Sequence, residues 1–244
     1  MTYLLWLLYR VLNLSLLASC ILSFTLSSTQ AAYAKYQPPR TQKPPSTYTD
    51  SSGVRGSCQT TGVSSPTLLA PMTHVGQTTS THPTFAWFVP YDQKIPIEFT
   101  LYEFDTNDQP TTLTYKYQLQ SSPGIMKLSL PQYKQGLTSG KKYLWQVETL
   151  CNPNRPSRNF LVRAEIEVVQ MPSTLKILLS REREPSERAN SYAEAGMWYD
   201  ALGEALAFTV DRQLKIVGIT LIQDLAQLEK SLQNLDLYNL ALSN

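Results

Sequence analysis

Of the three cysteines in this chain, Cys58 and Cys151 lie outside the apolar N-terminal segment and could form a covalent cross-link with each other. Cys151 ends the strand-like run KYLWQVETLC, in which Tyr143, Trp145 and Val147 share its parity, so we expect its side chain to point toward a core. In an exported protein, two cysteines outside the leader favour one disulfide, which for so long a loop contributes about 4–5 kcal/mol in the chain-entropy model. Two free thiols, or pairing with another chain, are the alternatives.

The loop NPNRPSRN, which follows Cys151, is a candidate ligand-binding loop because it carries Arg155 and Arg158. A guanidinium group binds a carboxylate or a sugar sulfate through two parallel hydrogen bonds. The alternative is a solvated turn in which Asn152 caps the strand end, and the Pro and Asn residues of the loop favour this alternative.

Two histidines, His74 and His82, are the only ones in the chain, and no Cys or carboxylate cluster accompanies them. This pattern predicts turn residues rather than metal ligands. Glu165 and Glu167 are spaced as residues on one solvated strand face, where nothing raises the pKa of a carboxyl group for acid–base catalysis. We likewise expect Glu98 and Glu103 to lie on a solvated strand face and to have no role in acid–base catalysis.

Sequence motifs of the common catalytic and nucleotide-binding sites, such as G-x-S-x-G, H-E-x-x-H, C-x-x-C and a Gly-rich phosphate loop, do not occur. We therefore expect no catalytic residue, no metal and no cofactor, and we expect that the protein is not an enzyme. The formal net charge of +2, without a basic cluster along one face, argues against a nucleic-acid partner.

The N-terminal segment has the pattern of an export signal. An apolar run interrupted by Arg10 is followed by Ala32-Tyr33-Ala34, which resembles a leader-peptidase site, so residues 1–34 are predicted to be a signal peptide. Two alternatives remain open. The run from Leu4 to Leu26 is long enough to span about 30 Å of hydrocarbon as an uncleaved anchor, and the sequence before Cys20 resembles a lipobox, although an apolar run continues after it.

Residues 35–56 contain two Pro-Pro pairs and no apolar periodicity, which predicts a Pro-rich disordered linker. Its function would be to hold a domain away from a membrane or wall. Export places the protein in the periplasm, the outer envelope or the extracellular space.

Residues 57–171 are predicted to form a β-domain. Seven short segments are separated by Pro-, Asn- and Gly-containing turns, and two of them, 113–119 and 160–168, alternate apolar and polar residues strictly. This alternation is typical of half-buried antiparallel strands. Seven strands in about 100 residues fit an immunoglobulin- or fibronectin-like sandwich.

Residues 172–244 are predicted to be a small helical unit, so the fold class is α+β. The segment ANSYAEAGMWYDALGEALAF has the spacing of one tetratricopeptide-like hairpin, with Gly196 at its turn. A last helix is expected from Ile222 to Leu242, with one apolar face that could contact a partner. The residues of this face are Leu225, Leu228, Leu232 and Leu235.

A succession of short motifs resembles an uncharacterised family called domain of unknown function 928. It includes RGSC (55–58), LLAP (68–71), HPTFAWFVP (82–90), SPGI (122–125), GKKYLW (140–145) and CNP (151–153), and AGMWYDAL (195–202) resembles its usual C-terminal extension. The resemblance covers roughly residues 55–206. It implies an exported protein of a cyanobacterial envelope, it supports the pairing of Cys58 with Cys151, and it implies no activity.

Together these patterns predict an exported cell-envelope protein that is a non-enzymatic binding or interaction module. Its partner would be an envelope protein or glycan, with membrane contact only through a leader that is not cleaved. A glycan-binding module is the alternative, because tyrosines are frequent in the β-region and exposed aromatic rings stack on sugars. An enzyme of an unrecognised type is a further alternative.

The leader pattern predicts that the mature protein begins at Lys35, because cleavage follows the small residue at the end of the A-x-A-like site. N-terminal sequencing of protein isolated from the envelope checks this. A sequence that begins at an acylated Cys20, or at Met1, would contradict it.

Overall fold

The computed structural model describes residues 35–46, 58, 62–152, 154–207 and 212–229. The predicted signal peptide, Cys20, Leu232 and Leu235 lie outside these residues. Within them, no helix combines the length and apolar character that a membrane crossing requires.

Eight strands of the described chain form two sheets. The smaller sheet has the order β1-β3-β6, from Thr67–Leu68, Thr84–Val89 and Gly124–Ser129. The larger has the order β2-β8-β7-β4-β5, from Gly76–Thr78, Phe160–Val168, Lys142–Thr149, Pro96–Phe104 and Pro110–Gln120. The α+β class is therefore confirmed, whereas the immunoglobulin- or fibronectin-like topology remains a prediction.

The strand absent from the sequence prediction is β2, which pairs in parallel with β8. Its three residues, GQT, are too few to show an alternating pattern. The other neighbouring strands pair antiparallel, as the turn-rich connections predicted.

Alternation places the large side chains between the two sheets. Phe85 of β3 lies 5.1 Å, between ring centroids, from both Phe99 of β4 and Trp145 of β7. These three rings are buried, as is Trp87. Aromatic packing across the two sheets thus forms the centre of the β-core.

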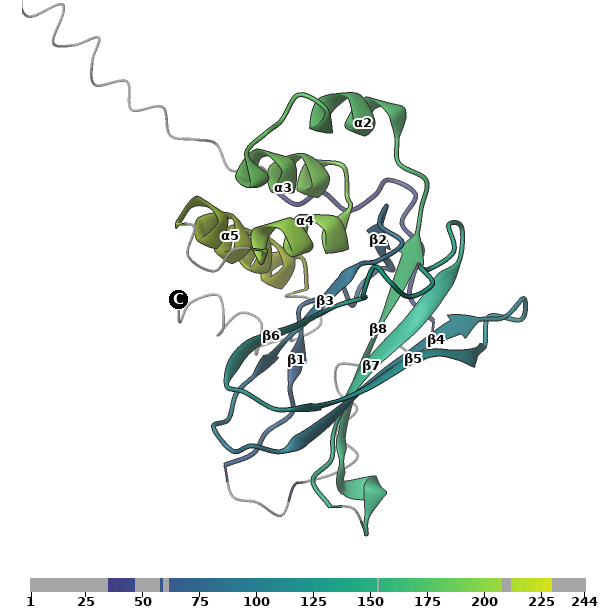
Figure 1. Ribbon diagram of the computed structural model, residues 1–244, viewed down its shortest axis with the longest axis vertical. Helices are drawn as coiled ribbons and strands as arrows, with labels where there is room; N and C mark the ends of the chain where they lie inside the picture. Colours follow the sequence, from purple (N-terminus) through teal and green to yellow (C-terminus); the bar gives the residue numbers. More distant parts are fainter. Residues whose placement is uncertain (1–34, 47–57, 59–61, 153, 208–211, 230–244) are drawn as a thin grey trace, which may run out of the picture. The chain divides into compact units, whose positions relative to one another are not determined.

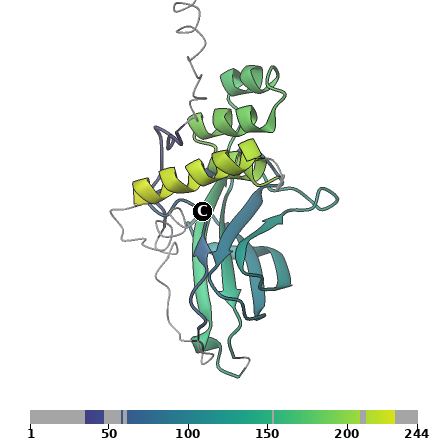
Figure 2. The ribbon, with the colours of Figure 1, turned by 90° about the vertical axis from the view of Figure 1, so that its left-hand side faces the viewer.

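Four helices follow the strands: α2 (Ser173–Leu179), α3 (Pro185–Glu194), α4 (Trp198–Ala205) and α5 (Arg212–Glu229). They gather near one end of the strands (Figure 1), and α5, the yellow helix in front in Figure 2, packs against both α3 and α4. Gly196 makes the hairpin turn with a φ of 79°, a left-handed conformation that favours glycine. The last helix starts ten residues before the predicted start at Ile222, and the chain after Glu229 is outside the described residues.

The helices and the sheets share one core. Trp198 Nε1 donates a hydrogen bond to the carbonyl of Leu69 at 2.9 Å, and Trp145 Nε1 donates to the Tyr199 hydroxyl at 2.8 Å. Trp198, Tyr199 and Trp145 are all buried. Residues 34–244 accordingly form one compact unit by their contacts.

Residues 35–46, which we call the strap, belong to the predicted disordered linker but pack on the domain, whereas residues 47–56 of that linker lie outside the described residues. Tyr36 is 1% exposed, its ring packs edge-on against Trp198, and its backbone N–H donates to Asp224 at 2.8 Å. Further along, Lys43 forms an ion pair with Glu167 at 2.6 Å. One buried tyrosine and a few polar anchors therefore order a segment whose composition suggested a spacer.

The strap leaves no room for a side chain at Gly196. A Cβ there would lie 3.0 Å from the Gln37 carbonyl oxygen and from Pro39, and the positive φ adds strain. We expect Gly196→Ala to lower the free energy of unfolding by about 1–3 kcal/mol.

The matched control is Gly203→Ala in α4, where a Cβ would lie at an ordinary 3.5 Å from Thr84. That change should raise the unfolding free energy by about 0.5–1 kcal/mol, because alanine favours the helix. Urea denaturation of both variants measures the difference. Equal effects of the two substitutions would show that the strap does not pack on the hairpin turn.

Candidate functional site

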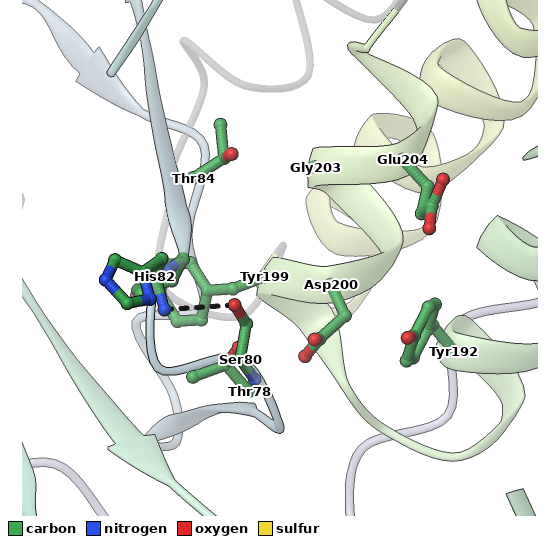
Figure 3. A pocket seen from close by; sticks show the side chains of 10 residues that line it. Thr78, Ser80, His82, Thr84, Tyr192, Tyr199, Asp200, Gly203 and Glu204 are labelled. Atoms are coloured by element: carbon green, nitrogen blue, oxygen red, sulfur yellow. Dashed lines mark hydrogen bonds between the residues drawn. The ribbon is translucent and has the colours of Figure 1, made fainter. Parts of the chain in front are cut away.

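A polar cavity of about 220 Å³, which we call the junction pocket, lies between the β2–β3 segment and the α3–α4 hairpin (Figure 3). Its position follows from the docking of α4, whose first turn is held by Trp198 and Tyr199 against the sheets. The lining residues are Thr78, Ser80, His82, Pro83, Thr84, Tyr192, Tyr199, Asp200, Gly203 and Glu204. A concave site where two structural units meet is a typical place for a ligand.

Asp200 is the carboxyl group in this pocket whose pKa its surroundings raise. Its carboxylate accepts hydrogen bonds from Thr79 N at 2.8 Å and from Thr79 Oγ1 at 3.0 Å. Burial raises the pKa of Asp200 to about 6, against the opposing effect of these hydrogen bonds. Near neutral pH this carboxyl group can both accept and, when protonated, donate a hydrogen bond.

The wall of the pocket that carries Asp200 comes from the helices. Arg188 of α3 donates to Glu204 Oε1 of α4 through Nε at 2.9 Å and Nη2 at 2.7 Å, which fixes that carboxylate. Tyr192 of α3 lies on the same side, and burial, with the nearby Asp200 charge, raises its pKa. The wall therefore offers an anchored carboxylate and a phenol.

The β2–β3 segment supplies hydroxyl groups. Ser80 Oγ accepts from the backbone N–H of His82 at 3.0 Å, and the imidazole of His82 points away from Asp200 (Figure 3). Both ring nitrogens of His82 are engaged, one with Thr81 Oγ1 at 3.0 Å and the other with the Lys134 carbonyl at 3.1 Å. His82 is thus placed to hold the loop rather than to activate Ser80 as a nucleophile.

His74 lies in a separate buried network. Its Nε2 is 2.8 Å from the Tyr36 hydroxyl and its Nδ1 is 3.1 Å from Thr73 Oγ1. Burial lowers the pKa of His74 to about 4, so the ring is neutral near pH 7. Glu229 Oε1 completes the network by accepting from Met72 N, Thr73 N and Thr73 Oγ1.

The two histidines therefore have different partners and different roles. Across the described ranges, no three His, Cys, Asp or Glu side chains are arranged to hold a metal ion.

Residues 50–235 match the family described as Domain of Unknown Function (DUF928). The chain belongs to the DUF928 family. The matched region includes both cysteines and the junction pocket, and it begins after the strap. Neither the search of curated proteins nor that of solved structures gives a match.

The predicted disulfide joins Cys58 to Cys151 within the DUF928 region, with the Cα atoms 5.2 Å apart. Cys151 is half-buried, and its backbone N–H donates to Asn159 Oδ1 at 2.9 Å. The bond thus fastens the end of β7 to the segment that precedes β1.

Arg155 and Arg158, the predicted ligand-binding residues, do not line the junction pocket. Arg155 precedes the short 3-10 helix η1 (Pro156–Arg158) and is exposed, whereas Arg158 is the last residue of η1 and is half-buried. Neither forms an ion pair with a carboxylate of the described chain, so their proposed role as ligand-binding groups remains a prediction.

The leucine face predicted on the last helix is partly occupied. Leu225 is fully buried and Leu228 is half-buried within the chain, while Leu232 and Leu235 lie outside the described residues. Leu225 therefore contributes to the protein's own core, and partner contact through the remaining residues is still a prediction.

Glu165 is a correction to the predicted solvated strand face, because it is only 1% exposed. Its carboxylate accepts from Ser46 N at 2.7 Å and forms an ion pair with Lys142 at 3.2 Å. Glu167 pairs with Lys43, Glu98 with Lys116 and Glu103 with Lys141. These carboxylates form ion pairs, and none lines the junction pocket.

Sequence reasoning missed the pocket itself, since its lining residues are spread over residues 78–204. One available signal was Asp200, an acidic residue in the otherwise apolar start of α4, WYDAL. An acid beside two buried aromatic residues indicates a partner across a packed interface.

The raised pKa of Asp200 predicts a specific pH dependence. Between its ordinary value of 3.8 and about 6, the folded state binds more protons than the unfolded state, so this group's contribution to stability falls as the pH rises. In Asp200→Asn, which keeps an acceptor for Thr79 but does not titrate, the unfolding free energy relative to the wild type should rise by about 2 kcal/mol from pH 4 to pH 7.

Chemical denaturation at several pH values measures this difference. The control is Asp92→Asn at an exposed site, whose difference from the wild type should not vary with pH. A pH-independent difference for Asp200→Asn would contradict the assignment.

Proposed function

We propose that this DUF928 protein is an exported cell-envelope protein, of a cyanobacterial envelope as the family resemblance implies, and that it acts as a non-enzymatic binding module through the junction pocket. The observation that carries the proposal is the pocket's lining, which combines hydroxyl groups, a phenol and two carboxylates at the meeting point of the sheets and the helices.

Export is supported by two observations. The first is the leader-like sequence of residues 1–34. The second is the disulfide between Cys58 and Cys151, since disulfides persist mainly in oxidising compartments.

Binding rather than catalysis is supported by how the reactive groups are held. His82 has both ring nitrogens engaged outside the pocket, and Glu204 is fixed by Arg188. Asp200 retains its hydrogen bonds from Thr79 and still faces the cavity (Figure 3). Such anchored donors and acceptors suit recognition of a small polar group, because they are oriented before the ligand arrives.

Gly203 provides a direct test, because it lines the pocket on α4 and a side chain placed there projects toward Thr84. We expect the purified full-length protein to co-sediment with the insoluble envelope fraction of its source cells. Gly203→Leu should weaken this binding at least about tenfold by filling the cavity, a loss of about 1.4 kcal/mol.

Gly203→Ala is the matched control, since its single methyl group leaves most of the cavity open, and it should bind like the wild type. Thermal unfolding of both variants must show that they remain folded. Wild-type protein that does not bind the envelope fraction, or a folded leucine variant that binds normally, would refute the proposed role of the pocket.

A further inference from the structure

A second and larger cavity, about 480 Å³, lies beside β5, and we call it the edge pocket. β5 is the last strand of the larger sheet, bonded to β4 on one side only among the described strands. The cavity is bounded by the first half of β5 and by residues 134–138 of the β6–β7 connection. It shares no lining residue with the junction pocket.

The charges around the edge pocket leave one cation without a carboxylate. Glu103 pairs with Lys141 at 3.1 Å, and Lys116 pairs with Glu98 at 2.8 Å. Lys134 instead holds its Nζ over aromatic rings, and in the described chain no carboxylate pairs with it. An anionic group of a ligand would therefore find an ammonium group available at this site.

Two tyrosine rings lie under the ammonium group of Lys134, and Tyr115, the one that lines the edge pocket, is only 8% exposed. Tyr115 and Tyr117 stack with their planes 8° apart and their centroids 6.1 Å apart. The Lys134 Nζ lies 5.8 Å and 5.1 Å from the two centroids. The hydroxyl of Tyr115 donates to the Gln135 carbonyl, which fastens the loop to the strand.

The remaining lining is rich in hydrogen-bonding groups and has no aliphatic side chain. It includes the hydroxyls of Thr112, Thr114 and Thr138 and the amide of Gln135. Apolar peptide side chains would find no matching surface, whereas the many hydroxyl groups of a sugar would find donors and acceptors.

We propose that the edge pocket binds an anionic saccharide. The carboxylate or sulfate of the sugar pairs with Lys134, and the sugar hydroxyl groups bond to the threonines and to Gln135. The proposal rests on the binding role proposed above, but it uses a different cavity.

Titration calorimetry with the full-length protein tests the proposal with three probes: oligogalacturonate, a heparin oligosaccharide and neutral maltohexaose. We expect binding of at least one charged probe and none of the neutral one. Lys134→Glu should weaken binding at least about tenfold, because it replaces a charge-assisted contact by repulsion. Lys134→Arg should retain it within about threefold.

Lys94→Glu is the control for net charge, since Lys94 is exposed and lies outside the edge pocket. It should bind like the wild type, and so should Gly203→Leu, which separates this site from the junction pocket. Preference between the two charged probes identifies a carboxylate or a sulfate as the recognised group. Equal weakening by Lys94→Glu and Lys134→Glu, binding of maltohexaose as strong as that of the charged probes, or no binding of either charged probe would overturn the proposal.

Discussion

The fold depends on one polar atom in the middle of the core, the hydroxyl oxygen of Tyr199. It accepts a hydrogen bond from Trp145 Nε1 at 2.8 Å and donates one to the Glu165 carbonyl at 3.0 Å, so α4, β7 and β8 meet at a single point. A buried hydroxyl without partners costs about 1–3 kcal/mol, which makes this arrangement of helix and sheet strongly preferred over neighbouring ones. The next residue, Asp200, is thereby brought onto Thr79, and the junction pocket exists because of that placement.

Local patterns predicted what local physics determines. The alternation in residues 113–119 and 160–168 located β5 and β8, and Gly196 located the hairpin turn. The cysteine count favoured the pairing of Cys58 with Cys151 over free thiols, and the structure contains this disulfide. In each case the prediction needed only a few neighbouring residues or the presence of two cysteines outside the leader.

What the sequence could not reveal depends on contacts between distant segments. Tyr36 and Asp224 are 188 residues apart, and the Pro-rich composition around Tyr36 gives no sign that the strap is anchored. Likewise, the period of β8 places Glu165 on an outward face, yet its side chain is buried, with Ser46 of the strap and Lys142 in contact with its carboxylate. The two pockets could not be predicted for the same reason. Each is lined by residues from several segments, and no single segment has a sequence pattern that indicates a binding site.

The position of the disulfide has a mechanical consequence. A tension applied between the two ends of the chain passes directly from Cys58 to Cys151 through the sulfur atoms, so the residues between them carry none of it. Seven of the eight described strands, β1 to β7, lie in that shielded stretch. The load falls instead on the strap, on β8 and on the helices, where the contact between Tyr36 and Asp224 is among the first to be strained. A chain pulled from both ends would thus lose its helical layer while the stretch from β1 to β7 stayed covalently closed.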